Sequence, residues 1–142
     1  MLRTTLLHPE LLATLGAAGH GSQVLITDGN FPHLTAPYEG AARVYLNLSP
    51  GRLTVSEVLE AVLSAIVVER AALMDPADDA DERPAAHAEL IPLLPAATPV
   101  DHLRRFDFYA ATKSEDLALV VATADLRPYA NVLLTLGVVS PG

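Results

Sequence analysis

The stretch Gln23-Val-Leu-Ile-Thr-Asp28 is a compact apolar run that stops at a carboxylate. A short run of this kind predicts a buried strand, with Asp28 at its carboxyl end. Gly29-Asn30 and Pro32 then break the strand. The segment Ala42-Arg-Val-Tyr-Leu-Asn-Leu-Ser49 alternates in part and carries β-favouring residues, so it predicts a second strand.

Two more apolar runs of strand length follow nearer the end of the chain. They are Asp116-Leu-Ala-Leu-Val-Val-Ala-Thr123 and Asn131-Val-Leu-Leu-Thr-Leu-Gly-Val-Val139, with Ala124-Asp-Leu-Arg-Pro128 between them. Their length and their content of β-branched residues predict two central strands.

Helical patterns lie between these strands. Pro9 to Gly16 has leucines at helical spacing behind a proline, which suits a first helical position, so it predicts a short helix. Thr54-Val-Ser-Glu57 has the spacing of a capping box and predicts a helix start. The apolar stripe that follows predicts a helix continuing to about Met74. This stripe comprises Val58, Leu59, Val62, Leu63, Ile66 and Val67.

Two segments connect the remaining elements. Residues Asp75 to Pro84 are acidic and contain two prolines, which favours a solvated loop or a frayed helical connection. Within Thr98 to Ser114, Val100 to Leu103 is open between a helix start and a strand, and a helix is expected from about Arg105. Strands interleaved with helices predict an α/β fold: a single domain over residues 1–142, with a largely parallel central sheet flanked by helices.

Composition narrows the function classes. The chain has 142 residues, 51% of them hydrophobic, and a formal net charge of −8. No Lys- or Arg-rich block is present to meet phosphates or an anionic bilayer, so we expect neither a nucleic-acid nor a membrane partner. The absence of cysteine excludes disulfides and thiolate chemistry and fits a cytoplasmic location.

Candidate functional residues are sought in two segments, because ligands of open α/β sheets bind beyond the carboxyl ends of strands. The first is Gly19-His20-Gly21-Ser22 together with Asp28, and the second is Arg127-Pro128-Tyr129-Ala130-Asn131. Between two glycines the His20 imidazole is open and can move protons near neutrality. A surface-loop histidine and a turn-forming Asp28 are the structural alternatives.

Sugar-binding groups are available around these segments. Tyr129 and Asn131 can hydrogen-bond hydroxyl groups, and Phe31 or Tyr109 can stack on the apolar face of a sugar, although Tyr129 also suits the edge of a core. The other four histidines show no ligand spacing, so no metal site is predicted. Neither a phosphate loop nor a dinucleotide fingerprint is present, and no nucleotide is implied.

In chain order these segments resemble the family that contains D-ribose pyranase and L-fucose mutarotase. The resemblance spans nearly the whole chain, and Phe106-Asp-Phe-Tyr109 is more similar to the fucose mutarotase branch. It is carried by Pro9-Glu-Leu-Leu, Gly19-His20-Gly21, Thr27-Asp-Gly-Asn-Phe-Pro32, Thr54-Val-Ser-Glu-Val-Leu-Glu-Ala-Val62, Arg105-Phe-Asp-Phe-Tyr109 and Tyr129-Ala-Asn131.

This resemblance implies an isomerase that interconverts the anomers, or the pyranose and furanose forms, of a free monosaccharide such as L-fucose or D-ribose. It makes His20 the proton donor, and Asp28, Arg105, Tyr129 and Asn131 the substrate contacts. It implies no cofactor. It also implies a ring-shaped homo-oligomer, a pentamer or decamer, with sites completed across subunit boundaries.

Two positions depart from the family pattern. Ser22 stands where the family commonly has an acidic residue that would orient the imidazole, and Ala110 stands where the fucose branch typically has glutamate. These departures leave a second hypothesis, a non-catalytic sugar-binding or transport-accessory protein on the same scaffold.

Overall fold

A computed structural model gives the structure of the protein and describes residues 1–78 and 83–142. Six strands form one sheet in the order β2-β5-β1-β6-β3-β4. Strand β6 is antiparallel to both of its neighbours, and the other three pairings are parallel, which confirms a largely parallel sheet. The strands are β1 (Gln23–Thr27), β2 (Ala42–Tyr45), β3 (Val68–Asp75), β4 (Val100–Arg104), β5 (Leu117–Ala122) and β6 (Val132–Leu136).

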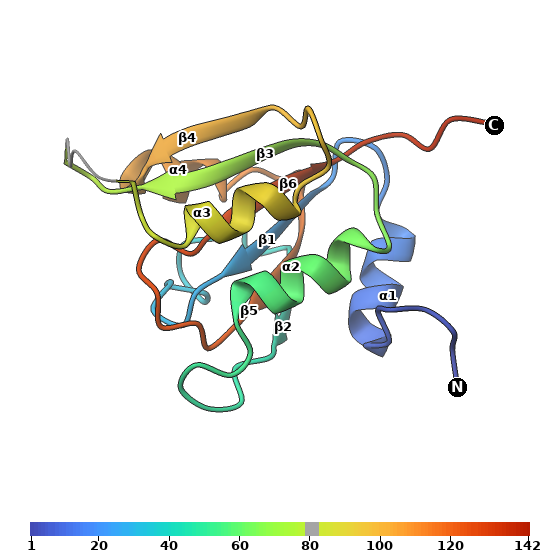
Figure 1. Ribbon diagram of the computed structural model, residues 1–142, viewed down its shortest axis with the longest axis horizontal. Helices are drawn as coiled ribbons and strands as arrows, with labels where there is room; N and C mark the ends of the chain where they lie inside the picture. Colours follow the sequence, from blue (N-terminus) through green and yellow to red (C-terminus); the bar gives the residue numbers. More distant parts are fainter. Residues whose placement is uncertain (79–82) are drawn as a thin grey trace.

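Helices cover both faces of this sheet (Figure 1). They are α1 (Pro9–Ala17), α2 (Val55–Leu63), α3 (His87–Leu90) and α4 (Arg105–Ala111), with a 3₁₀ turn at Ile91–Leu93. One buried cluster joins side chains of α1, α2 and α3 to one face of the sheet, and a second places Phe108 of α4 against the other. Among the described residues no helix is long and apolar enough to cross a membrane.

The predicted capping box at the start of α2 is confirmed. The Thr54 hydroxyl accepts a hydrogen bond from the Glu57 amide at 3.3 Å. The Glu57 carboxylate accepts one from the Thr54 amide at 2.9 Å. Together they satisfy two amides that the first turn of a helix leaves without partners.

The prediction that this helix continues to about Met74 is wrong. Helix α2 ends at Leu63, and the chain re-enters the sheet as β3, which pairs with β6 on one side and β4 on the other. Within β3 the four consecutive residues 71–74 are all buried, so this part of the strand is apolar without alternation. Such a run cannot be distinguished from a buried helix by periodicity alone.

The structure also decides whether the segment from Val100 to Leu103 is a helix start or a strand. Val100–Arg104 is a strand and not a helix start, and α4 begins at Arg105 as predicted. Asp75, predicted to open a loop, is the last residue of β3. The remainder of that predicted loop lies partly outside the described residues, at positions 79–82.

Candidate functional site

Asp28 and Asn131 meet at one end of the central strands β1 and β6. Asp28 follows β1 and Asn131 precedes β6, and because these strands are antiparallel neighbours, the end of one lies beside the start of the other. The Asn131 amide nitrogen donates to the Asp28 carboxylate at 3.1 Å, and its oxygen accepts from the Asp28 backbone amide at 2.8 Å. The pair therefore fixes the orientation of both side chains.

The Asp28 carboxyl group is buried, with only 4% of the residue exposed. Burial raises its pKa above the ordinary value, although hydrogen bonds from the Asn30 amide and the Asn131 side chain oppose the shift. A carboxyl group whose pKa is displaced toward neutrality suits proton exchange with a bound hydroxyl.

Tyr129 reaches the same end of these strands from the loop between β5 and β6. Its backbone has φ of 60°, in the left-handed region that tyrosine rarely adopts. Such a conformation persists only when the surrounding structure enforces it. The adjoining segment is held by Asp125, whose buried carboxylate accepts hydrogen bonds from the Arg127 guanidinium at 2.7 and 3.0 Å and from the Val55 amide at 2.9 Å.

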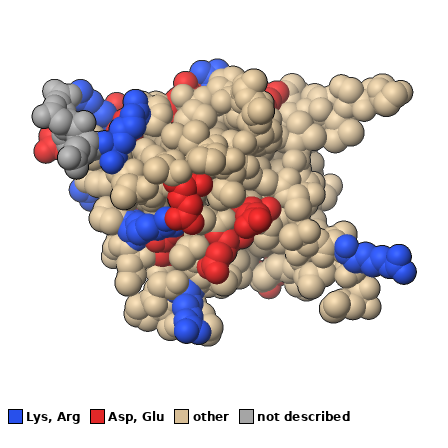
Figure 2. All heavy atoms as spheres, in the orientation of Figure 1, with Lys and Arg blue, Asp and Glu red and all other residues tan. Residues whose placement is uncertain are grey.

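Arg127 extends this network across the face that carries α2 and α3. Its guanidinium donates to Ser56 at 3.1 Å and forms an ion pair with Glu89. Figure 2 shows acidic side chains gathered beside a basic one over these two helices. The loop that carries Tyr129 is thus tied to two helices.

Arg105 comes to the pocket from the first turn of α4. Its Nε donates to the Tyr109 hydroxyl at 3.0 Å, and its guanidinium carbon lies 5.6 Å from the Tyr109 ring centroid. The Phe31 ring packs edge-on against Tyr109, with centroids 5.4 Å apart. These contacts hold a cation and two aromatic rings beside Asp28.

The strand ends and α4 together line a pocket of about 170 Å³ that is open to solvent. Four of the five predicted site residues line it, together with the two aromatic side chains expected to stack on a sugar. A carboxyl group, a phenol, an amide and a guanidinium beside aromatic rings suit a small polyhydroxylated ligand. The lining residues are Asp28, Asn30, Phe31, Met74, Arg105, Tyr109, Pro128, Tyr129 and Asn131.

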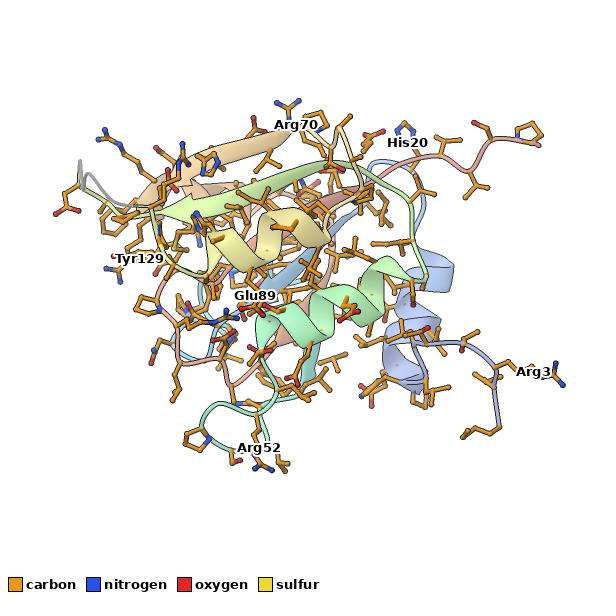
Figure 3. The ribbon with its side chains drawn as sticks, viewed as in Figure 1. Arg3, His20, Arg52, Arg70, Glu89 and Tyr129 are labelled. Carbon is orange, nitrogen blue, oxygen red and sulfur yellow. The ribbon has the colours of Figure 1, made fainter. Side chains whose placement is uncertain are left out.

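His20, the fifth predicted residue, lies elsewhere in the chain. It precedes β1, whereas Asp28 follows it, so the five residues of β1 separate them by roughly 16 Å. Figure 3 shows His20 and Tyr129 on opposite sides of the molecule. The structure therefore does not bring His20 into the pocket of its own chain.

The surroundings of His20 nevertheless suit an oriented imidazole. Gly21 has φ of 84°, the unusual turn expected beside this histidine. Nε2 of His20 lies 2.9 Å from a carboxylate oxygen of Glu69 on β3. The Ser22 hydroxyl accepts a hydrogen bond from the Gly19 amide at 3.3 Å. Glu69 was not predicted, because its segment was interpreted as helix.

One cluster had no sequence signal at all. Asp75, His87 and His102 place a ligand-type atom each within 4.8 Å of one another. Their spacings of 12 and 15 residues match no short metal motif, and the cluster exists only because β3 and β4 pair beside α3.

The chain is similar to proteins of known family over nearly its whole length. Residues 1–139 match the model of the RbsD / FucU transport protein family. A D-ribose pyranase of Paracidovorax citrulli is 35% identical, over 97% of this chain and 98% of that protein. A fucose mutarotase of Mus musculus is 30% identical, over 96% of this chain and 92% of that protein. These identities separate the two branches only weakly.

Solved structures show the same fold. FucU from Bifidobacterium longum superposes with a TM-score of 0.81 at 28% identity, covering 96% of this chain and 100% of that one. RbsD of Bacillus subtilis, solved in complex with D-ribose, superposes with a TM-score of 0.82 at 22% identity, covering 99% of this chain and 100% of that one.

Proposed function

The chain belongs to the RbsD / FucU transport protein family, and from this membership we propose that it is a sugar mutarotase or pyranase acting on a free monosaccharide. The pocket that Asp28 shares with Asn131, Tyr129 and Arg105 carries the proposal. Its polar groups match the hydroxyls of a sugar, and Phe31 and Tyr109 supply apolar surface.

Ring opening requires two proton movements. A proton is delivered to the ring oxygen and another leaves the anomeric hydroxyl, while the bond between the anomeric carbon and the ring oxygen breaks to give the open aldehyde. The aldehyde group rotates and the ring closes again by the reverse steps. Asp28 or Tyr129 exchanges the hydroxyl proton, and Arg105 and Asn131 hold the sugar.

His20 supplies the proton for the ring oxygen, from a second copy of the chain. The roughly 16 Å between His20 and Asp28 within one chain excludes direct cooperation there. A ring of five or ten copies, in which His20 of one copy meets the pocket of the next, completes the site. Exposed Phe106 and Leu126, at 66% and 62%, support burial of such surfaces between copies.

The proposal extends to location and substrate. The absence of cysteine supports action in the cytoplasm, where disulfides are rare. D-ribose and L-fucose are the first substrates to test, since relatives with both names match the chain.

Saturation-transfer NMR on a panel of free aldoses tests the activity. We expect faster exchange between anomers, or between pyranose and furanose forms, with the wild-type protein. Asp28→Asn should slow this exchange. Asp116→Asn, which changes an exposed carboxylate away from the pocket, is the matched control and should not slow it. Unaltered exchange for every aldose with the assembled wild-type protein would contradict the proposal.

A non-catalytic sugar-binding protein is the second candidate. It is favoured by the position of His20 outside the pocket of its own chain, and by Ala110, where the resemblance to the fucose mutarotase branch implied glutamate. Titration calorimetry with the same sugars distinguishes the two candidates. Saturable binding without faster exchange would support this alternative.

A further inference from the structure

We propose that Asp75, His87 and His102 form a binding site for one divalent transition-metal ion, for which Zn²⁺ is the best match. The site is independent of the proposed sugar chemistry. The three residues come from the end of β3, the start of α3 and the middle of β4. Two imidazoles and one carboxylate are a donor set that zinc prefers.

The distances already approach those of a metal centre. Nδ1 of His102 lies 3.2 Å from Oδ1 of Asp75, and Nδ1 of His87 lies 3.7 Å from the same oxygen. Ligand atoms bound to a tetrahedral zinc ion at ordinary bond lengths are about 3.3 Å apart. Small side-chain rotations therefore convert the cluster into three zinc ligands.

His87 provides an independent observation that points to a ligand. Its side chain is only 2% exposed. Neither of its ring nitrogens has a hydrogen-bond partner among the described residues, although backbone oxygens of Tyr129 and Met74 lie near the ring. A buried polar group without a partner is costly, and native structures rarely leave one. A bound cation at Nδ1 would supply the missing partner.

Nδ1 of His102 cannot satisfy both of its neighbours by hydrogen bonding. Its Nδ1 faces both the Arg83 guanidinium and the Asp75 carboxylate. One ring nitrogen either donates or accepts, so it cannot donate to Asp75 and accept from Arg83 together. The Arg83 side chain is 61% exposed and can move into water when a cation takes its place.

Three protein ligands leave one tetrahedral position for water, on the side that Arg83 now covers. The ion would join α3 to the β3 and β4 edge of the sheet. Met74, which precedes Asp75, lines the sugar pocket, and because successive residues of a strand point to opposite faces, Asp75 faces away from that pocket. We therefore assign the ion a structural role in joining α3 to the sheet.

Metal binding is measured on the full-length assembled protein after chelator treatment and dialysis. Calorimetry with ZnCl₂ should give about one equivalent per chain, and Co²⁺ should produce the visible absorption bands of a tetrahedral site. Zinc should also raise the thermal unfolding midpoint, because it binds the folded state.

Variants establish where the ion binds. His102→Gln and, separately, Asp75→Asn should weaken zinc binding at least ~10-fold, as expected for loss of a direct ligand. His8→Gln, a histidine substitution at the start of α1, should retain it. Circular dichroism verifies the fold of each variant. No zinc binding by the wild-type protein, or equal binding by a folded His102→Gln or Asp75→Asn variant, would overturn the proposal.

Discussion

Nε2 of His20 lies 2.9 Å from a carboxylate oxygen of Glu69, a contact that joins the loop before β1 to strand β3. Ser22 stands at the position where the family resemblance implied an acidic partner for this histidine. Glu69 supplies a carboxylate from another part of the chain, and it can fix the orientation of the imidazole in the same way. The departure at Ser22 therefore does not leave His20 without a partner.

Replacing Glu69 with Gln should lower kcat about 10-fold and leave KM nearly unchanged, because the imidazole loses its orienting carboxylate while the pocket stays intact. Glu69→Asp should restore part of the rate. Anomer exchange measured by NMR at several sugar concentrations separates kcat from KM. Glu115→Gln, on the exposed segment before β5, is the control. An unchanged kcat in Glu69→Gln would exclude this positioning role.

The pH profile should reveal the buried carboxyl group in the pocket. Burial raises the pKa of Asp28, so kcat/KM should fall with decreasing pH through a value above 3.8, the ordinary pKa of such a group. Residual activity in Asp28→Asn should lack this acid limb. If the limb persists in the variant, another group controls it.

Arg127→Met should reduce the free energy of unfolding by about 2 kcal/mol. The substitution leaves the Asp125 carboxylate buried without its cation, and the partial exposure of Arg127, at 30%, keeps the loss below that of a fully buried pair. Urea unfolding measures the change, with Arg3→Met in the exposed N-terminal segment as the control. A second substitution, Asp125→Asn, should recover part of the lost stability.

Stability should also fall as the pH drops below about 6.5, the ordinary pKa of histidine. Burial lowers the pKa of His33 in the folded protein, so the unfolded chain takes up a proton first. The stability present above pH 6.5 is lost as the pH falls toward the folded pKa. His33→Gln should therefore reduce this dependence. Urea unfolding at pH 5 and 7.5 tests this, and an identical pH dependence in wild type and variant would contradict it.

The sequence predicted most strands and helix starts because their signals are local. The capping box at Thr54 and the start of α4 at Arg105 are confirmed for this reason. The error at β3 has a different origin. Residues that pair on both sides within a sheet carry the same apolar pattern as a buried helix, and only the contacts of β3 with β4 and β6 decide between them.

The sequence identified the pocket residues by their positions next to strands, but it did not predict how the strands bring them together. Asp28 follows β1 and Asn131 precedes β6, so in a fully parallel sheet they would lie at opposite ends of the strands, and only the antiparallel pairing of β6 with β1 brings them together. The partnership of His20 with Glu69 depended on recognising β3 as a strand. The cluster of Asp75, His87 and His102 depends on the register of β3 against β4, which no local pattern in the sequence encodes.

The most direct test mixes two variants that each lack most of the activity. His20→Ala and Asp28→Asn are each assembled alone, and also mixed in equal amounts, unfolded and refolded together, before sugar exchange is measured by NMR. Wild type should accelerate exchange, and each variant alone should retain only a small residual rate. The mixture should recover about a quarter of the wild-type rate, because random assembly gives an intact His20 beside an intact Asp28 in about one site of four. A mixture no more active than its parents, with wild type active and the assembly confirmed, would contradict a site shared between two copies.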